Sequence, residues 1–354
     1  MLENMKAINK GNIYDALTAI DLFCGCGGLT LGLKQAGFNV IGAVEIDKLA
    51  AETYKINHPQ TKLWEKDIRK LKAKDVLTEL KIEPEELDLL AGCPPCQGFS
   101  TLKTLNGSRT ITDERNELIF DFLRFVRALR PKAIMLENVP SLAKDDRIYT
   151  VCRRLKKYGY KYEIRIVNAA DFGVPQRRRR MILIAGLKGI ADFAEIDFNH
   201  RTVRATITDL LPAGESGDIL HDLPEHRTDI VRKRIAGITK NGGGRQDLDK
   251  TLQLKCHKKC DGFKDVYGRM KWDDVAPTIT SGCTNPSKGR FLHPEENRAI
   301  TLREAALLQS FPPDYSFSLN QGKGNAAVMI GNALPPEMVR RHAVKVVEYL
   351  MEVK

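Results

Sequence analysis

The segment Cys93-Pro94-Pro95-Cys96 holds the strongest candidate for a reactive side chain in this sequence. A cysteine thiolate is a soft nucleophile when the pKa of the thiol is lowered and its backbone is held rigidly. The two prolines restrict the backbone that presents the second thiol, because each ring fixes one backbone angle. The segment therefore predicts a nucleophilic cysteine at position 96.

Two other kinds of cysteine chemistry fit the same spacing. A C-x-x-C pair is typical of thiol–disulfide exchange, but the proline pair disfavours the helix that usually follows the first cysteine. The pair is also half of a zinc site, with Cys256 and Cys260 available as the other half at an atypical spacing. We favour the nucleophile and expect no bound metal, and we keep redox exchange and zinc as alternatives.

A carboxylate and a run of arginines accompany the cysteine. Glu137 ends an expected strand, and the run Gln176-Arg177-Arg178-Arg179-Arg180 precedes another. The simpler interpretation is a basic turn whose ion-pair partner is Glu137. Together with Cys96, however, these residues supply a nucleophile, a carboxyl group that can hold a proton, and fixed positive charges. This combination favours a catalytic site.

Acidic residues also follow three successive expected strands. Asp21 and the glycine-rich loop 23–28 follow the first strand and open a helix, whose first N–H groups favour a negatively charged ligand. Glu45 ends the second strand, where an acid can accept hydrogen bonds from ribose hydroxyls. Asp67 ends the third, where it can accept a bond from an adenine amino group. The loop matches neither GxxxxGK[ST] nor GxGxxG, so we expect a nucleoside-bearing cofactor other than ATP or NAD.

Short apolar runs alternate with amphipathic helices from residue 16 to about 187. This pattern predicts an α/β fold with a doubly wound, mostly parallel sheet, closed by an antiparallel pair around 171–180. Ligands bind at the carboxyl ends of the strands in such folds, which is where the candidate residues lie. The expected strands are 18–23, 39–45, 63–67, 87–91, 133–137, 162–168 and 181–186, and the expected helices are 29–36, 117–129, 148–158 and 336–353.

The charge of the chain is positive and unevenly distributed. Its 354 residues carry 56 Lys+Arg and 45 Asp+Glu, and 13 basic but only 5 acidic residues lie within 227–271. A solvated face is the simpler explanation of one charge run, but one-sided charge over so long a segment favours phosphate contacts with nucleic acid.

No apolar stretch is long enough for a membrane span, and the first residues lack a signal-peptide core. Eight cysteines without regular spacing indicate reduced thiols. We therefore expect a cytoplasmic protein associated with the nucleoid.

Taken in order, these landmarks resemble the DNA (cytosine-5)-methyltransferases of bacterial type. The resemblance runs from about Thr18 to the final helix, with a gap at 188–271, where that family carries its target-recognition region. One departure is Cys24-Gly25-Cys26, where the family more often has another small residue first. The matching segments are 21–28, Glu45, Asp67, 94–97, 137–139, Gln176 with Arg178 and Arg180, 303–306, 309–312 and 331–336.

The resemblance implies transfer of a methyl group from S-adenosylmethionine to carbon 5 of a cytosine flipped out of double-stranded DNA, with S-adenosylhomocysteine as product. Cys96 would add to carbon 6 and make carbon 5 electron-rich. Glu137 would bond N3 and the exocyclic amine and stabilise the charge that addition creates. Arg178 and Arg180 would hold the base carbonyl and shape the pocket.

The same resemblance implies two further sets of contacts. The cofactor residues are Asp21, Phe23, Gly25, Gly27, Gly28, Leu29, Glu45, Ile46, Asp67, Ile68, Pro95, Leu118, Asn332 and Ala333. The DNA-binding residues are Gln97, Ser100, Lys103, Arg109, Arg115, Gln176, Arg232, Lys233, Arg234 and Arg245. Separately, the segment 101–115 directly follows the cysteine motif, so we expect a loop that closes over DNA phosphates, with an ordinary polar surface loop as the simpler alternative.

We expect a catalytic domain of residues 1–187 plus 300–354 and a target-recognition domain of residues 188–299. The expected partners are double-stranded DNA and a cognate restriction endonuclease, with no membrane and a monomeric enzyme. A tRNA cytosine-5 methyltransferase of the same fold is the alternative, against which the long basic insert argues. A catalytically silent DNA-binding protein is the other alternative, and the presence of Cys96, Glu137, Arg178 and Arg180 argues against it.

Overall fold

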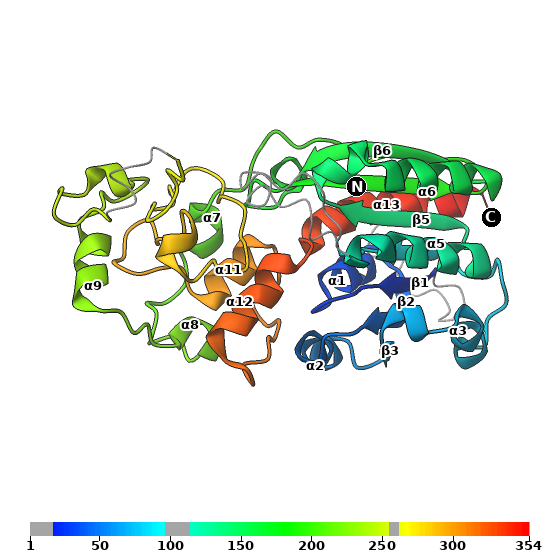
Figure 1. The fold of residues 1–354 in the computed structure, drawn as a ribbon, viewed down its shortest axis with the longest axis horizontal. Coiled ribbons are helices and arrows are strands. Elements are labelled where there is room, and N and C mark those ends of the chain that lie inside the picture. Colours follow the sequence, from blue (N-terminus) through cyan, green and yellow to red (C-terminus); the bar gives the residue numbers. More distant parts are fainter. Residues whose placement is uncertain (1–16, 96–113, 255–261, 354) are drawn as a thin grey trace, which may run out of the picture.

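A seven-stranded sheet forms the centre of the larger lobe of the molecule (Figure 1). The computed structural model describes residues 17–95, 114–254 and 262–353. The strand order is β3-β2-β1-β4-β5-β7-β6, with β7 antiparallel to both β5 and β6 and the other pairs parallel. The strands are β1 (Thr18–Leu22), β2 (Asn39–Glu45), β3 (Lys62–Glu65), β4 (Leu89–Gly92), β5 (Ala133–Asn138), β6 (Lys161–Asn168) and β7 (Arg179–Gly186). The expected doubly wound sheet and its closing antiparallel pair are confirmed.

Helices cover both faces of this sheet, which explains why its central strands are apolar along their whole length. One face packs against α3 (Ala73–Leu80), α5 (Leu118–Leu129) and α6 (Asp146–Lys157). The other packs against α1 (Gly28–Gln35) and α13 (Pro336–Glu352). The expected helices are confirmed with small differences at their ends. None of the helices in the described part of the chain has the length and apolar composition that a membrane span requires.

Two expected positions shift at these element ends. Asp67 lies beyond β3, where its side chain caps the 3-10 helix Ile68–Lys70 by accepting from the Arg69 N–H. Glu117 belongs to a separate 3-10 helix, Glu114–Glu117, that precedes α5. A short polar side chain is well suited to accept from the first N–H groups of a helix, which explains why Asp67 stands at the N-cap of this turn rather than within β3.

The smaller lobe consists mostly of loops and short helices (Figure 1). Its core cluster includes residues from α11 (Leu302–Leu308) and α12 (Gly322–Asn332), which lie in this lobe, whereas α13 returns to the sheet and packs on α1. The same cluster also contains Cys26, Leu49 and Ala50 of the larger lobe, so α11 and α12 lie against both lobes, and the expected division of the chain at residue 300 stays a prediction. The remaining α-helices of the described residues are α2 (Lys48–Asn57) in the larger lobe and α7 (Arg204–Ile207), α8 (Ile219–Asp222) and α9 (Asp229–Ala236) in the smaller one. Further 3-10 helices are Pro140–Lys144, Ala169–Phe172, Arg245–Asp247 and Pro286–Lys288.

A buried arginine holds several loops of the smaller lobe together. Arg269 is fully buried, and its guanidinium donates to the backbone carbonyls of Ile235, Ile238 and His293 at 2.9 to 3.1 Å. The Ile235 carbonyl lies in the last turn of α9 and also accepts from the Ile238 N–H, whereas Ile238 and His293 lie in loops, where no regular ladder supplies donors. Arg269 therefore replaces part of the hydrogen bonding that strands would otherwise provide.

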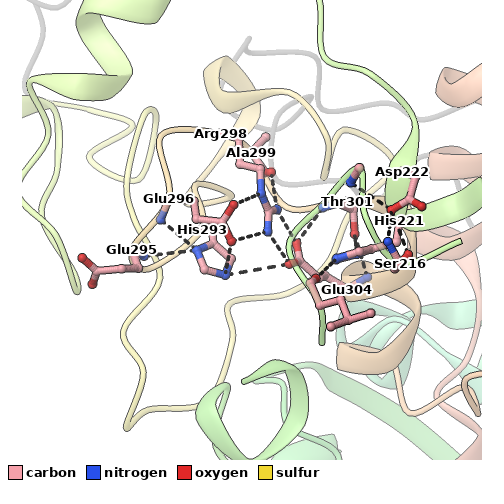
Figure 2. Close-up of polar contacts among 12 residues, drawn as sticks. Ser216, His221, Asp222, His293, Glu295, Glu296, Arg298, Ala299, Thr301 and Glu304 are labelled. Atoms are coloured by element: carbon pink, nitrogen blue, oxygen red, sulfur yellow. Dashed lines mark hydrogen bonds and ion pairs between the residues drawn. The ribbon is translucent and has the colours of Figure 1, made fainter. Parts of the chain in front are cut away.

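A second polar group, here called the Glu304 cluster, comprises Glu304, Arg298, Thr301, His293 and His221 (Figure 2). Glu304 is almost fully buried and accepts from both terminal nitrogens of Arg298, at 2.7 and 2.8 Å, and from the Thr301 N–H at 2.8 Å. Thr301 Oγ1 lies 2.9 Å from Nδ1 of His221. The cluster ties the start of α11 to α8 and to the loop before α11.

Candidate active site

Glu137 and Arg180 form an ion pair at the carboxyl edge of the sheet. Arg180 Nε lies 2.7 Å from Glu137 Oε1, and both side chains are mostly buried. The strand register explains the pair, because Glu137 lies opposite Ile182 and Arg180 is its diagonal neighbour on the same face. The two residues that the sequence placed at separate strand ends therefore meet, and the guanidinium fixes one oxygen of the carboxyl group.

Cys93 follows β4 and lies close to Glu137. Burial, and then the negative charge of Glu137, raises the pKa of the Cys93 thiol well above its ordinary value. A thiol that stays protonated is a poor nucleophile and a poor attacking group in disulfide exchange. Cys93 is therefore suited to neither role, which weakens the redox alternative.

Cys96 lies outside the described residues, but the chain that leads to it is described. The side-chain amide of Asn138 donates to the Pro94 carbonyl at 2.9 Å, and its oxygen accepts from the Val139 N–H at 2.8 Å. Asn138 is buried. The end of β5 therefore anchors the backbone just before Cys96.

Arg178 differs from the expectation that it holds the base carbonyl. It is buried, and its two terminal nitrogens donate to the backbone carbonyls of Ile279 and Gly331 at 2.9 and 3.0 Å. Burial lowers the pKa of Arg178 to about 9. Its guanidinium joins the start of β7 to the smaller lobe and to the end of α12, so we correct its role from base contact to structural tie.

Gln176 differs in the same way from its expected role at the DNA surface. It is fully buried, its amide oxygen accepts from the Ile279 N–H at 2.8 Å, and its amide nitrogen donates to Gln309 Oε1 at 2.8 Å and to the Leu308 carbonyl at 3.2 Å. Both ends of the amide are occupied by protein groups. Gln176 is therefore a second tie between the sheet and the smaller lobe, and it is not available to DNA in this structure.

The carboxylate of Glu45 organises the loop after β1. One oxygen accepts from the Gly25 N–H and the other from the N–H groups of Ile46 and Asp47, all at 2.8 Å. Burial raises the pKa of Glu45, and these backbone bonds partly offset the shift. The neighbouring Ile46 is 64% exposed. A fixed acid and an exposed apolar side chain thus lie side by side at the end of β2.

Asp21 lies beneath the same loop. It is fully buried, accepts from Thr30 Oγ1 at 2.7 Å, and its other oxygen has no hydrogen-bond partner among the described residues. Burial raises the pKa of Asp21 to about 8, although the bond from Thr30 opposes the shift. Thr30 Oγ1 also lies 2.9 Å from the Tyr54 hydroxyl. Asp21 therefore acts as an internal support of the loop.

These residues fit a nucleoside-bearing cofactor with a carboxylate at its other end. Gly25 has a φ of +55°, and a Cβ at this position would meet no atom within 4 Å, so the loop borders open space next to Glu45. The first N–H groups of α1 lack intrahelical acceptors and suit a carboxylate. The surface of Ile46 suits a flat base. The edge therefore offers one complementary feature for each part of S-adenosylmethionine.

The remaining residues of the expected cofactor set lie around this edge of the sheet. They differ in how exposed their side chains are and in whether other protein groups already bond them. The Asp67 carboxylate is held by Arg69 Nη2 at 2.6 Å, and this contact keeps the pKa of Asp67 below its ordinary value. An incoming adenine would therefore compete with Arg69. Leu118 packs at the edge of the apolar core, Asn332 is exposed at the end of α12, and Ala333 is buried beside it. Of the others, Phe23 and Gly27 lie in the loop after β1, Gly28 and Leu29 begin α1, Ile68 begins the 3-10 helix after β3, and Pro95 follows β4.

The expected DNA contacts divide into three groups. Gln97, Ser100, Lys103 and Arg109 lie outside the described residues. Arg115, Arg232 and Lys233 are exposed, the last two on α9 at the end of the smaller lobe distant from the sheet (Figure 1). Arg234 and Arg245 instead donate to the carbonyls of Leu252 and Gly262 at 2.7 and 2.6 Å. These last two side chains brace loops of the smaller lobe.

Several positioning residues were not expected from the sequence. Asn138, His58 and Tyr315 carry hydrogen bonds at this edge, yet only Asn138 lies in a recognised motif. His58 and Tyr315 meet across 257 positions of sequence, and no spacing pattern signals such a contact.

Among the described residues, no group of three His, Cys, Asp or Glu side chains is arranged to hold a metal ion, and Cys256 and Cys260 lie outside that part.

Comparison with known proteins gives a consistent result. A family model described as C-5 cytosine-specific DNA methylase matches residues 17–348. The chain is 36% identical over 348 residues to the Type II methylase M.HgiDII of Herpetosiphon aurantiacus, covering 94% of this chain and 95% of the relative. It is 35% identical over 347 residues to the Type II methyltransferase M1.HphI of Haemophilus parahaemolyticus, covering 94% and 87%.

Solved structures agree in fold. A DNA modification methyltransferase encoded within a prophage, from E. coli, has a TM-score of 0.70 and 25% identity, with 95% of this chain and 100% of that chain covered. A DNMT2 of Spodoptera frugiperda has a TM-score of 0.64 and 18% identity, with 95% and 100% covered, and this likeness concerns the fold alone.

Proposed function

Since the chain belongs to the C-5 cytosine-specific DNA methylases, we propose that Cys96 is the nucleophile of its methyl transfer and that Glu137, held by Arg180, is the acid that works beside it. The enzyme transfers a methyl group from S-adenosylmethionine to carbon 5 of cytosine in DNA. We assign the addition to the base and the stabilisation of the resulting charge to residues of this chain.

Cys96 attacks carbon 6 of a cytosine that has been flipped out of the helix, because the ring edge is not accessible within stacked duplex DNA. The new S–C6 bond pushes electron density toward carbon 5 and N3. Glu137 holds a proton at N3 and accepts from the exocyclic amine, so the charge that addition creates is neutralised where it develops. Arg180 fixes the orientation of Glu137 throughout. Carbon 5 would then bond to the methyl group while the bond from that group to the sulfonium sulfur breaks, with S-adenosylhomocysteine as the product that leaves. Loss of the carbon 5 proton and departure of the Cys96 thiolate then restore the aromatic ring.

The methyl donor is assigned to the edge formed by the loops after β1, β2 and β3. Bound there, S-adenosylmethionine supplies an electrophilic methyl group. Glu45 accepts from ribose hydroxyls, Ile46 covers one face of the adenine, and the N–H groups at the start of α1 face the carboxylate. The full proposed set is Phe23, Gly25, Gly27, Gly28, Leu29, Glu45, Ile46, Asp67, Ile68, Pro95, Leu118, Asn332 and Ala333, with Asp21 supporting the loop from within.

The main support for assigning Cys96 and Glu137 to catalysis is that the ends of the neighbouring strands β4 and β5 lie together. Glu137 is held by Arg180 at 2.7 Å, while Asn138, the next residue, holds the Pro94 carbonyl at 2.9 Å on the way to Cys96. One strand end thus supports both the acid and the approach to the nucleophile.

Covalent trapping on duplex DNA that contains 5-fluorocytosine tests the proposal. The wild-type enzyme with S-adenosylmethionine should form an adduct that survives denaturation, and Cys96→Ser should form none. Cys93→Ser is the matched control and should trap normally, since its thiol stays protonated. Trapping by Cys96→Ser, or loss of trapping in Cys93→Ser alone, would show that the nucleophile is assigned wrongly.

The nucleic-acid substrate is tested separately by labelled methyl transfer to duplex DNA and to tRNA, where incorporation into tRNA alone would support the RNA alternative. We assign DNA phosphate contacts to the loop after Cys96 and to the exposed basic residues, and base reading to the smaller lobe within 188–299. The proposed contacts are Gln97, Ser100, Lys103, Arg109, Arg115, Arg232 and Lys233.

The names of the relatives support a further proposal about partners. M.HgiDII and M1.HphI are both named as Type II enzymes, so we assign to this chain a companion restriction endonuclease with the same target sequence. We also propose that the enzyme works as a monomer and associates with the nucleoid through DNA alone. Bisulfite sequencing of DNA from expressing cells would give the target sequence, and sedimentation analysis would give the oligomeric state.

A further inference from the structure

A buried tyrosine from the C-terminal part of the chain supports the loop after β1. The Tyr315 hydroxyl donates to the Cys26 carbonyl at 2.5 Å, and the Nε2 atom of His58 lies 3.1 Å from the same hydroxyl. The other ring nitrogen of His58 lies 3.4 Å from the ammonium of Lys34. All of these residues except Lys34 are at least 95% buried.

Only one assignment of donors and acceptors is consistent with the contacts that run from Lys34 through His58 and Tyr315 to the Cys26 carbonyl. The Lys34 ammonium can only donate, so Nδ1 of His58 must accept and Nε2 must carry the ring proton. Nε2 then donates to the Tyr315 oxygen, which leaves the single tyrosine proton for the Cys26 carbonyl. Burial, and then the charge of Lys34, lowers the pKa of His58 to about 4, which keeps the ring neutral and preserves this order.

The loop after β1 leaves no space for a side chain at Gly27, the residue that follows Cys26. Gly27 has a φ of +99°, and a Cβ there would lie 2.5 Å from His58 Nε2 and 2.6 Å from the Tyr315 hydroxyl. Gly27 is also the N-cap residue of α1, so its orientation sets the direction of the N–H groups that begin the helix. A rotation of the peptide between Cys26 and Gly27 would therefore change the direction in which α1 begins.

Resting on the cofactor site proposed above, we propose that Tyr315, oriented by His58, is a positioning residue for S-adenosylmethionine: its hydroxyl fixes the Cys26 carbonyl and thereby the conformation at Gly27, from which α1 begins beside the carboxylate of the cofactor. Tyr315 also packs against Phe311 and Phe317, which lie between α11 and α12. The cofactor loop of the larger lobe is therefore supported by a segment that belongs to the smaller one.

The substitution Tyr315→Phe removes the hydroxyl and keeps the ring contacts. The Kd for S-adenosylmethionine, measured by titration calorimetry, should rise about tenfold, the usual effect of losing one well-placed hydrogen bond. The Kd for duplex DNA and the kcat at saturating cofactor should remain within about twofold of wild type. Tyr349→Phe on α13 is the matched control, because it removes a buried tyrosine hydroxyl that accepts from the Lys188 N–H, and it should leave the cofactor Kd unchanged.

Two variants of His58 test the orientation step independently. Glutamine can accept from Lys34 and donate to Tyr315, so His58→Gln should bind the cofactor nearly as wild type does. His58→Leu can do neither and should weaken cofactor binding as Tyr315→Phe does. These variants also decide the matter if Tyr315→Phe does not fold.

A purely structural role would give a different result. Tyr315→Phe would then lower the melting temperature of the cofactor-free protein and leave the cofactor Kd unchanged, and this outcome would overturn the proposal. Equal weakening by Tyr349→Phe would overturn it as well, as would identical cofactor affinities for His58→Gln and His58→Leu.

Discussion

The side-chain amide of Asn138 donates to the carbonyl of Pro94 at 2.9 Å, so the residue after the proposed acid holds the backbone that leads to the proposed nucleophile. The two prolines stiffen this backbone, but stiffness alone does not place it. Asn138 places it relative to β5, on which Glu137 is also fixed. Acid and nucleophile therefore share one rigid support.

Loss of this bond should slow the covalent step more than it weakens binding. For Asn138→Ala we expect the rate of adduct formation on 5-fluorocytosine DNA to fall between about 10-fold and 100-fold, because a displacement of the nucleophile by about 1 Å costs that much. Asn138→Asp keeps the acceptor for the Val139 N–H and loses the donor to Pro94. It should therefore resemble the alanine variant, and a normal rate in the aspartate variant would show that the donor is unimportant.

Arg178 should be important for stability rather than for contact with the base. Arg178→Lys keeps the charge but cannot reach the carbonyls of Ile279 and Gly331 together. We expect a loss of about 1–3 kcal/mol in the free energy of unfolding, because buried carbonyls are left without donors. The measurement is urea unfolding, with the exposed Arg179→Lys as control. A variant of normal stability with a raised KM for DNA alone would support the base contact instead.

The sequence predicts the sheet well because its strands carry local signals. β1, β4 and β5 are buried on both faces and read as short apolar runs, and the pairing of Glu137 with Arg180 follows once their strands are neighbours. The roles of Gln176 and Arg178 do not follow in this way, because both depend on contacts with residues more than 100 positions away. The helices of the smaller lobe are similarly hard to predict, since α7 and α8 have only four residues each and no useful periodicity.

Acidification should destabilise the larger lobe through two buried histidines. Burial lowers the pKa of His58 and of His342 from about 6.5 to about 4. The unfolded chain therefore binds more protons than the folded protein in this range, so stability is complete above pH 6.5 and is lost as the pH falls toward 4. Each histidine accounts for a loss of up to about 3 kcal/mol by pH 4.

Urea unfolding between pH 7.5 and pH 4.5 measures this loss. His342 packs against Phe172 and Phe193, so His342→Phe suits the pocket and removes one of the two titrating groups. The variant should start from a lower stability, because the bond to the Met338 carbonyl is lost, but its stability should decline less steeply with falling pH. A decline as steep as that of wild type would contradict the assignment.

The Glu304 cluster should determine the stability of the smaller lobe (Figure 2). Burial alone would raise the pKa of Glu304, but the hydrogen bonds from Arg298 hold it below its ordinary value, so the pair stays charged at neutral pH. Glu304→Gln removes that charge, and the one acidic partner that Arg298 then keeps within the described part of the chain is the more exposed Glu296. Since breaking one side of a buried pair leaves the other side poorly compensated, we expect a loss of about 2–4 kcal/mol.

Hydrogen exchange locates this effect within the molecule. In Glu304→Gln, the amides of 293–308 and of α8 should exchange faster, whereas those of β1, β4 and β5 should keep their protection, because the sheet has its own core. Glu348→Gln is the matched control, since it breaks an exposed pair with Lys345 on α13, and exposed pairs contribute less than about 1 kcal/mol. Unchanged exchange in 293–308 would show that the lobe does not depend on the cluster. Equal loss of protection in both lobes would show instead that they unfold as one unit.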